Sequence, residues 1–143
     1  MAAIVRPTAS QLVDLGVLVG AVPYLGAKMH LCTIDFTPTK DTVLADLVAG
    51  EANFVGYAAK TITWLGPYLD GLDNAVADAV ANWIMTGALP TNICYVAYIT
   101  DSASAILLAS WRIDTSLNFA VVNDGATLTA SITLGNGTAI QVP

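Results

Sequence analysis

Residues 93–134 carry a succession of strand and turn signals that constrains the fold more than any other part of the chain. Ile93–Thr100 is rich in β-branched and aromatic residues, and Asp101–Ser104 supplies turn chemistry before a second strand over Ala105–Ile113. Thr127–Leu134 alternates apolar residues with hydroxyl residues, which predicts a strand with one buried face. Consecutive strands at this spacing predict antiparallel pairing in a β-sandwich or a β-barrel.

The connection between these strands carries its own signals. Asn118–Val122 predicts a further short strand. Asn123-Asp124-Gly125 predicts a tight turn, because glycine tolerates a positive φ. The last third of the chain therefore reads as a run of strands joined by short turns.

The first ninety residues mix helix and strand signals. Apolar residues recur at helical spacing from Leu12 to Val22, so a first helix is predicted, with Thr8 or Ser10 as its cap and Pro23 beyond its end. A second, shorter helix is indicated for residues 41–49, between Asp41 and Gly50. We expect a mainly β fold, an antiparallel β-sandwich or barrel with one or two short helices in its N-terminal half.

Strands are also indicated in this half. Lys28–Phe36 is apolar on both faces, which predicts a strand covered on both sides. Tyr57–Leu65 alternates and is predicted as a strand that ends at a Gly-Pro pair. The segment from Leu72 to Trp83 has helical spacing, but Val80–Met85 also fits a strand, and the local pattern leaves both open.

Charge is scarce in this sequence. Of the 143 residues, 55% are hydrophobic and 11% are charged, whereas an ordinary domain has about 25% charged residues. Such a chain is too apolar for disorder. It either spans a membrane or covers apolar surface with partners. Leu12–Leu25 is too short for the ~20 residues that a membrane-spanning helix needs, and Asp14 and Pro23 interrupt it. We therefore expect no membrane span.

The basic residues do not form a nucleic-acid site. Net charge is −6, and the five basic residues lie scattered along the chain. Binding to phosphates requires clustered Lys and Arg, so direct nucleic-acid binding is not expected. No linker, charge block or repeat divides the chain, which is predicted to form a single domain over residues 1–143.

Residues that could carry catalysis are few. His30 is the only histidine, and without a Gly-x-Ser-x-Gly elbow we expect a strand histidine that is partly buried or at an interface. Asp70, Asp73 and Asp78 lie in a turn-rich segment. Asp70, Asp73 and Asn74 lack the spacing and the terminal Glu of a calcium loop. We expect no catalytic centre, no cofactor and no metal site.

Cysteines and tryptophans are expected to serve packing. Cys32 and Cys94 lie in apolar strand-like runs and read as buried hydrophobic residues, with a disulfide between them left open. Trp64, Trp83 and Trp111 lie in or beside predicted strands, where a large aromatic residue anchors a core or an interface. The alternative for the tryptophans is a sugar-binding platform.

Two sequence blocks carry a family resemblance. The first is Glu51–Ile62, which contains a Phe-x-Gly-Tyr segment, and the second is Ile93–Ile113, followed by Asn123–Leu134. Together they resemble small structural proteins of tailed bacteriophages. The resemblance implies a β-rich virion component, and it favours a strand for Val80–Met85.

The function that this resemblance implies is structural rather than enzymatic. The expected role is a capsid cement or decoration protein, made in the host cytoplasm and placed on the capsid surface. Its expected partners are the major capsid protein and further copies of itself in a homotrimer. The alternative is a tail- or fibre-associated carbohydrate-binding module, and a hydrolase that uses His30 or paired aspartates is a third hypothesis.

Both ends of the chain are apolar and suit strand addition to a neighbour. They are an N-terminal arm, residues 2–7, and a C-terminal tail, residues 135–143. The residues expected at interfaces are Ile4, Val5, Tyr57, Trp83, Ile140 and Val142.

Overall fold

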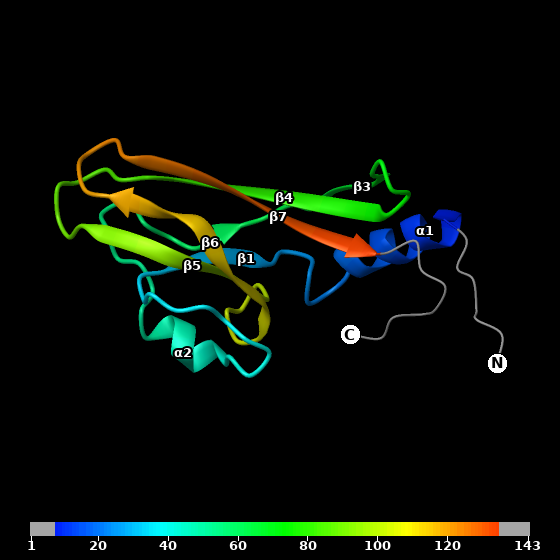
Figure 1. Cartoon of the computed structure of the whole chain (residues 1–143), viewed down its shortest axis with the longest axis horizontal. Coiled ribbons are helices and arrows are strands. Elements are labelled where there is room, and N and C mark those ends of the chain that lie inside the picture. Colours follow the sequence, from blue (N-terminus) through cyan, green and yellow to red (C-terminus); the bar gives the residue numbers. More distant parts are fainter. Residues whose placement is uncertain (1–7, 135–143) are drawn as a thin grey trace.

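Two antiparallel sheets pack face to face in the computed structural model, which describes residues 8–134 (Figure 1). Sheet A has the strand order β2 (Lys60–Thr61), β1 (Lys28–Cys32), β5 (Asn92–Thr100) and β6 (Leu107–Phe119). Sheet B has the order β3 (Leu65–Leu69), β4 (Ala75–Ile84) and β7 (Gly125–Leu134). The predicted mainly β fold is confirmed as a sandwich, and over residues 8–134 its sheets end in edge strands and do not close into a barrel.

The main core lies between the two sheets. β4 alternates buried Ala79, Ala81 and Trp83 with outward-facing residues, so its apolar face has the period of a strand. This face meets the buried side chains of β1 and β5. Phe54 and Phe119 stack within the same core, with 4.0 Å between their ring centroids. The ambiguity over residues 72–86 is thereby resolved in favour of a strand.

Helix α1 (Thr8–Val19) covers a second, smaller core. β4 and β7 run past the end of sheet A toward α1 (Figure 1). There Leu15 and Val19 pack on Ala75 and Ala77 of β4. The predicted first helix is confirmed, although it ends before Val22.

Helix α2 (Leu44–Val48) covers the outer face of sheet A. Leu47 packs there on Cys32, Val96 and Tyr98. Because the other face of β1 meets the main core, β1 is covered on both sides, as predicted. The paired strand is shorter than residues 28–36, and the helix is shorter than residues 41–49. Cys32 and Cys94 are free and buried, so they act as buried hydrophobic residues.

The predicted hairpin between β5 and β6 is confirmed. Its turn is held by Asp101, whose carboxylate accepts hydrogen bonds from the backbone N–H groups of Ala105 and Ile106 at 2.7 and 3.0 Å. These backbone hydrogen bonds, that of Ile106 first, lower the pKa of the Asp101 carboxyl. In this segment the turn residues and the strand residues both predict the hairpin that the structure contains.

The strand predicted for residues 57–65 is wrong over most of its length. Only Lys60 and Thr61 pair, as the short β2 at the edge of sheet A. The chain then crosses to sheet B, where β3 begins at Leu65. A segment that passes from one sheet to the other cannot pair with one neighbouring strand along its whole length, even where its side chains alternate as in a strand.

The end of the chain holds a second correction. A separate strand at residues 118–122 is not formed, because β6 continues to Phe119 and a loop follows. β7 then pairs with β4 in the other sheet rather than with β6. The positive φ of the predicted turn, 77°, belongs to Asn123 and not to Gly125. The turn therefore joins the two sheets instead of closing a hairpin.

Membrane-spanning helices were not expected. Across residues 8–134, neither α1 nor α2 has the length and apolar character that crossing a bilayer requires.

Phe54→Ala should lower the free energy of unfolding by about 3–5 kcal/mol, because it empties a fully buried site against Phe119. Val122→Ala, at an exposed loop position, is the control and should change stability by less than about 0.5 kcal/mol. Urea denaturation followed by tryptophan fluorescence measures both. Equal effects of the two substitutions would contradict the packing described for Phe54.

Candidate functional site

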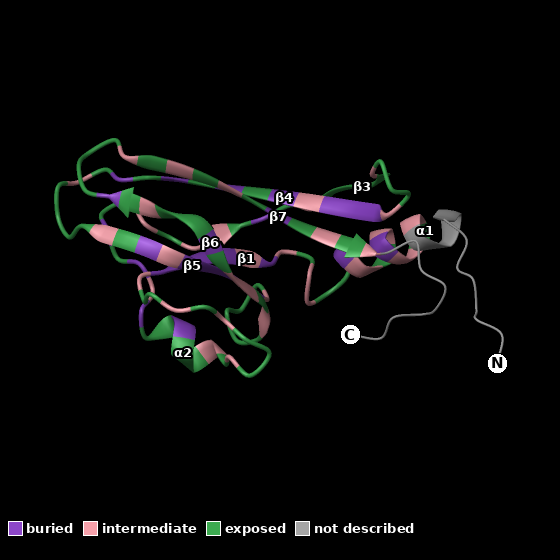
Figure 2. Cartoon of the chain, viewed as in Figure 1, coloured by how far each residue is buried: buried purple, intermediate pink, exposed green. Residues whose placement is uncertain are grey.

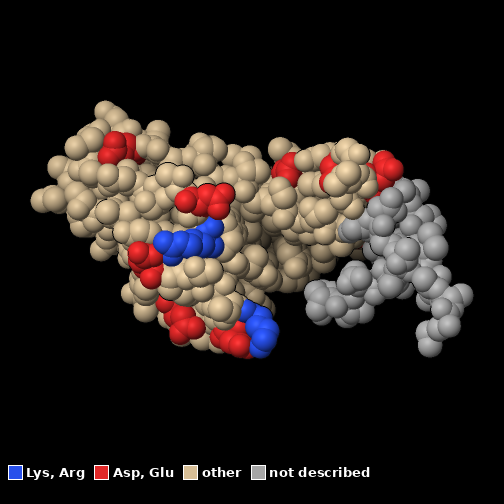
Figure 3. Space-filling view, in the orientation of Figure 1, with Lys and Arg blue, Asp and Glu red and all other residues tan. Residues whose placement is uncertain are grey.

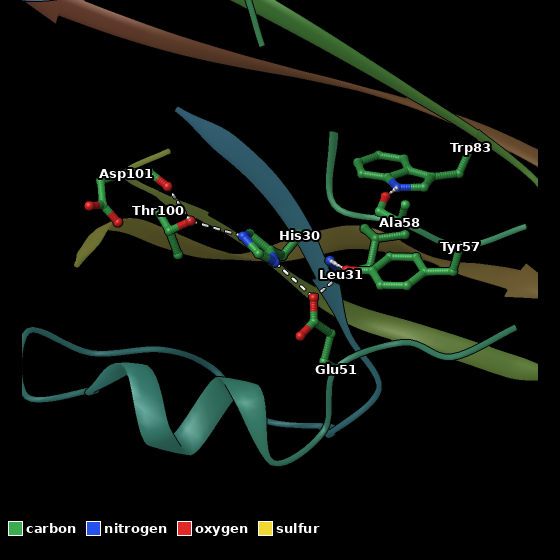
Figure 4. A network of polar contacts seen from close by, with 8 residues as sticks. All are labelled: His30, Leu31, Glu51, Tyr57, Ala58, Trp83, Thr100 and Asp101. Carbon is green, nitrogen blue, oxygen red and sulfur yellow. Dashed lines mark hydrogen bonds and ion pairs between the residues drawn. The ribbon is translucent and has the colours of Figure 1, made fainter. Parts of the chain in front are cut away.

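The only histidine lies in a buried polar network on the outer face of sheet A (Figure 4). His30 is 4% exposed, and its ring stacks on Tyr98 with 4.5 Å between centroids. Its Nδ1 lies 2.8 Å from Oε1 of Glu51, and its Nε2 lies 2.9 Å from Oγ1 of Thr100. The network therefore joins β1, β5 and the segment that follows α2.

The neighbours of His30 are themselves hydrogen-bonded. The Tyr57 hydroxyl donates to the same Glu51 oxygen at 2.9 Å, and it accepts a hydrogen bond from the Leu31 N–H at 3.2 Å. Desolvation by burial is the main cause that raises the pKa of the Tyr57 phenol, and the nearby Glu51 carboxylate adds to it. Tyr57 consequently remains a protonated donor at neutral pH.

Two proton arrangements satisfy the histidine. In both, Nδ1–H donates to Glu51. The Thr100 hydroxyl either donates to a neutral Nε2 or donates to the Asp101 carbonyl, 3.0 Å away, and accepts from a protonated Nε2. The Thr100 hydroxyl thus links the imidazole ring to the turn after β5.

A carboxylate, a histidine and a hydroxyl in this order have the connectivity of a hydrolytic triad. Thr100 is 0% exposed, however, and a substrate carbonyl cannot reach its hydroxyl in this conformation. The observed geometry supports a packing role, in which polar groups of two strands and a loop satisfy one another. His30 lies on a strand as expected, but it is buried rather than partly buried or at an interface. The sequence does not identify Glu51 and Thr100 as partners of His30, because they lie 21 and 70 residues away from it.

Two of the acidic residues considered as catalytic or calcium-binding groups, Asp70 and Asp78, form structural hydrogen bonds. The Asp70 carboxylate accepts hydrogen bonds from the N–H groups of Asn74 and Leu72, which lowers its pKa and closes the β3–β4 turn. Asp78 accepts hydrogen bonds from Ser131 and from Tyr68 on the outer face of sheet B. Among residues 8–134, no three His, Cys, Asp or Glu side chains gather in a way that could hold a metal ion.

The residues predicted at interfaces fall into three groups. Tyr57 is half-buried in the network above. Trp83 is 1% exposed, and its indole N–H donates to the Ala58 carbonyl at 2.9 Å, so it belongs to the core and offers no surface to a partner. Assigning Trp83 to an interface is therefore corrected: the alternation of β4 points its side chain inward. The remaining four lie outside the described residues, namely Ile4, Val5, Ile140 and Val142.

An aromatic cleft opens between the edge strands β6 and β7. Its volume is about 450 Å³. Trp64 and Trp111 line it together with Tyr24, whose carbonyl accepts a hydrogen bond from the Trp64 indole at 3.1 Å. Both tryptophans also pack against the main core. We call this feature the aromatic cleft.

Exposed aliphatic side chains gather at the end of the sandwich away from α1. They come from the end of β4 and from loops that are hydrogen-bonded to one another, since Thr86 N–H bonds to the Val55 carbonyl and Asn123 N–H to the Met85 carbonyl. Their exposure ranges from 43% to 73%. We call this group the apolar end, and its members are Val55, Ile84, Leu89, Val121 and Val122.

Few charged side chains accompany these exposed apolar surfaces. Figure 3 shows a face on which charged side chains lie scattered and most of the area is uncharged. Arg112 pairs with Asp35 at 2.6 Å, and Lys40 pairs with Asp41 at 2.8 Å. The described surface therefore carries exposed apolar groups beside few and partly neutralised charges.

Comparison of the chain with protein-family models, with curated proteins and with solved structures found no match.

Glu51→Ala should lower the free energy of unfolding by about 1–3 kcal/mol, because it leaves His30 and Tyr57 with buried donors that have no acceptor. Glu51→Gln is the matched control, since its amide oxygen can still accept from both groups, and it should retain most of the stability. Urea denaturation at neutral pH measures the difference. Equal losses in the two variants would show that the hydrogen bonds of Glu51 do not hold this network together.

Proposed function

We propose that the chain is a structural protein of a tailed-phage particle, a capsid cement or decoration protein that binds the lattice of the major capsid protein. The observation that carries the proposal is the apolar end, where five exposed aliphatic side chains gather. Exposed apolar patches of this kind mark protein–protein contacts, because burying them removes apolar surface from water. The resemblance of residues 51–62, 93–113 and 123–134 to phage structural proteins supplies the class of partner.

The low charge content of the chain supports the same role. A protein that works alone in water covers its surface with charged residues, typically about 25% of its sequence. Here charged residues make up 11%. A chain whose surface is covered in an assembled particle does not depend on that charge for solubility.

Self-association is part of the proposal. Capsid cement proteins are commonly trimers, and a homotrimer on the capsid surface would bury further apolar area. Helix α1 offers one such face, since Val13 and Val17 are exposed while Leu15 and Val19 are buried. Both sides of α1 are thus apolar, although sheet B covers only one of them.

Val121→Asp with Val122→Asp should reduce binding to shells of the major capsid protein by at least about tenfold, because two charges would have to be desolvated at the contact. Val22→Asp is the control, at an exposed loop position near α1, and should leave binding unchanged. Co-sedimentation of the purified chain with the shells measures the bound fraction. Circular dichroism of each variant checks that the fold is intact.

Two results would contradict the proposal. One is the absence of the chain from purified particles when their proteins are identified by mass spectrometry. The other is unaltered co-sedimentation of the double variant. For the trimer, light scattering at micromolar concentration is the direct test, and a monomer would exclude it.

A second candidate function rests on the aromatic cleft. Tyr24, Trp64 and Trp111 border an opening between two sheet edges, and aromatic faces of this kind can stack on sugar rings. A tail- or fibre-associated carbohydrate-binding module would use this cleft, and not the buried Trp83.

Trp111→Ala should abolish glycan binding if the second candidate is right, because it removes one wall of the cleft. The same substitution should leave shell binding through the apolar end unchanged. A glycan array with the unaltered chain is the first measurement, and an empty array removes the candidate. Loss of shell binding in Trp111→Ala with the fold intact would instead place the shell contact at the cleft.

A further inference from the structure

The loop that joins β6 to β7 carries Val121 and Val122 of the apolar end, at the end of the sandwich away from α1 (Figures 1 and 2). A single side-chain oxygen holds this loop. Oδ2 of Asp124 accepts hydrogen bonds from the backbone N–H groups of Ala120 at 2.7 Å and of Val121 at 2.9 Å. These hydrogen bonds, that of Val121 first, lower the pKa of the Asp124 carboxyl, so the loop stabilises the carboxylate form.

The backbone of the same loop is bonded to Met85, the residue that follows β4. Met85 N–H donates to the Asp124 carbonyl at 2.8 Å, and Asn123 N–H donates to the Met85 carbonyl at 2.8 Å. Within the loop, Asp124 N–H donates to the Val121 carbonyl at 3.1 Å, which closes a four-residue turn. The third residue of that turn, Asn123, has a φ of 77°, a left-handed conformation that asparagine tolerates. Val122 therefore lies at the tip of a turn that is hydrogen-bonded on both sides.

A second loop of the apolar end is held in the same way. Oδ1 of Asn92 accepts hydrogen bonds from the N–H groups of Asn53 at 2.7 Å and of Phe54 at 3.0 Å, directly before Val55. This oxygen belongs to a neutral amide. A side-chain oxygen without a charge therefore suffices to hold two successive N–H groups in this part of the molecule.

Charge is otherwise absent from the segments that form the apolar end. These segments are residues 53–56, 84–91 and 119–124, and Asp124 is the only charged residue in them. A lone carboxylate at an interface can pair with a basic group of the partner, or it can bond within its own chain. The two N–H groups that donate to Oδ2 favour the second role.

We propose that Asp124 is the positioning residue of the apolar end: its side-chain oxygen fixes the loop that presents Val121 and Val122 to the major capsid protein, and its charge makes no ion pair with that partner. The inference rests on the proposed docking role of the apolar end. A loop that is already ordered loses less conformational entropy on binding than a loop that becomes ordered on contact. Removing the oxygen should therefore weaken binding although the aliphatic side chains are unchanged.

Three substitutions separate the two roles of the carboxylate. Asp124→Ala removes the acceptor oxygen and should weaken co-sedimentation with shells of the major capsid protein at least about fivefold. Asp124→Asn removes the charge but keeps an oxygen that can accept from both N–H groups, so it should bind as the unaltered chain does. Asp101→Ala is the matched control, because Oδ1 of Asp101 holds two N–H groups of the β5–β6 turn in the same way. That turn lies at the opposite end of β5 from Asn92, so its loss should leave shell binding unchanged.

Amide hydrogen exchange gives a readout that needs no shells. In the unaltered chain and in Asp124→Asn, the N–H groups of Ala120 and Val121 should be protected from exchange. In Asp124→Ala they should exchange at least about ten times faster, because their acceptor is gone. NMR of the purified chain measures these rates, and circular dichroism establishes that each variant is folded.

Three results would overturn the proposal. Equal loss of binding in Asp124→Ala and Asp124→Asn, with the N–H groups still protected in Asp124→Asn, would assign the carboxylate to an ion pair with the partner. Unchanged binding of a folded Asp124→Ala would show that the loop needs no positioning. An equal loss in Asp101→Ala would show that loosening any turn weakens binding. If Asp124→Ala does not fold, the binding of Asp124→Asn alone decides between the two roles.

The variant Val121→Asp with Val122→Asp keeps these results apart from the proposed function. Unaltered binding of that double variant removes the docking role of the apolar end, and the positioning role with it. Loss of binding in the double variant beside normal binding of Asp124→Ala removes the positioning role alone.

Discussion

The structure depends on β5 being buried on both faces. Its Ala97 and Ile99 pack in the core between the sheets, and its Val96 and Tyr98 pack beneath α2. A strand with two apolar faces requires a layer on each side, so sheet B must lie over one face and the α2 segment over the other. The pairing of β5 with both β1 and β6 then fixes the order of sheet A.

The same constraint explains the buried polar network. His30 of β1 stacks on Tyr98 of β5, on the face of sheet A that the α2 segment covers. An imidazole without hydrogen-bond partners would carry a desolvation penalty there. Glu51, which follows α2, and Thr100, at the end of β5, supply the partners. Hydrogen bonds are directional, so these contacts fix the position of the α2 segment relative to the sheet. Apolar packing at Leu47 is not directional and does not specify that position. The connectivity of a triad has here a structural cause: a buried strand histidine needs one hydrogen-bond partner at each ring nitrogen.

Local pattern predicted those elements in which one face is apolar and the other is not. β7 and the hairpin of β5 and β6 follow from alternation and turn residues, and α1 follows from helical spacing. The sheet to which each strand belongs could not be predicted in this way. β7 leaves β6 and pairs with β4, more than forty residues earlier, and a long-range pairing of this kind leaves no local trace. The hydrogen-bond partners of His30 lie 21 and 70 residues away in the sequence. Trp83 faces the core because it falls on the inward-pointing positions of the alternating strand β4.

The edge strands and the apolar end expose different chemical groups on the described surface. An uncovered edge strand pairs with any available strand, so natural proteins shorten, charge or cover such edges. β7 is ten residues long and carries no charged side chain, which leaves covering as its means of protection. Within residues 8–134, no strand pairs with the outer edge of β7, and no segment covers the aliphatic side chains of the apolar end. The edge of β7 and the apolar end therefore offer two different kinds of contact: the edge presents backbone hydrogen-bonding groups to a strand, and the apolar end presents aliphatic side chains to a partner surface.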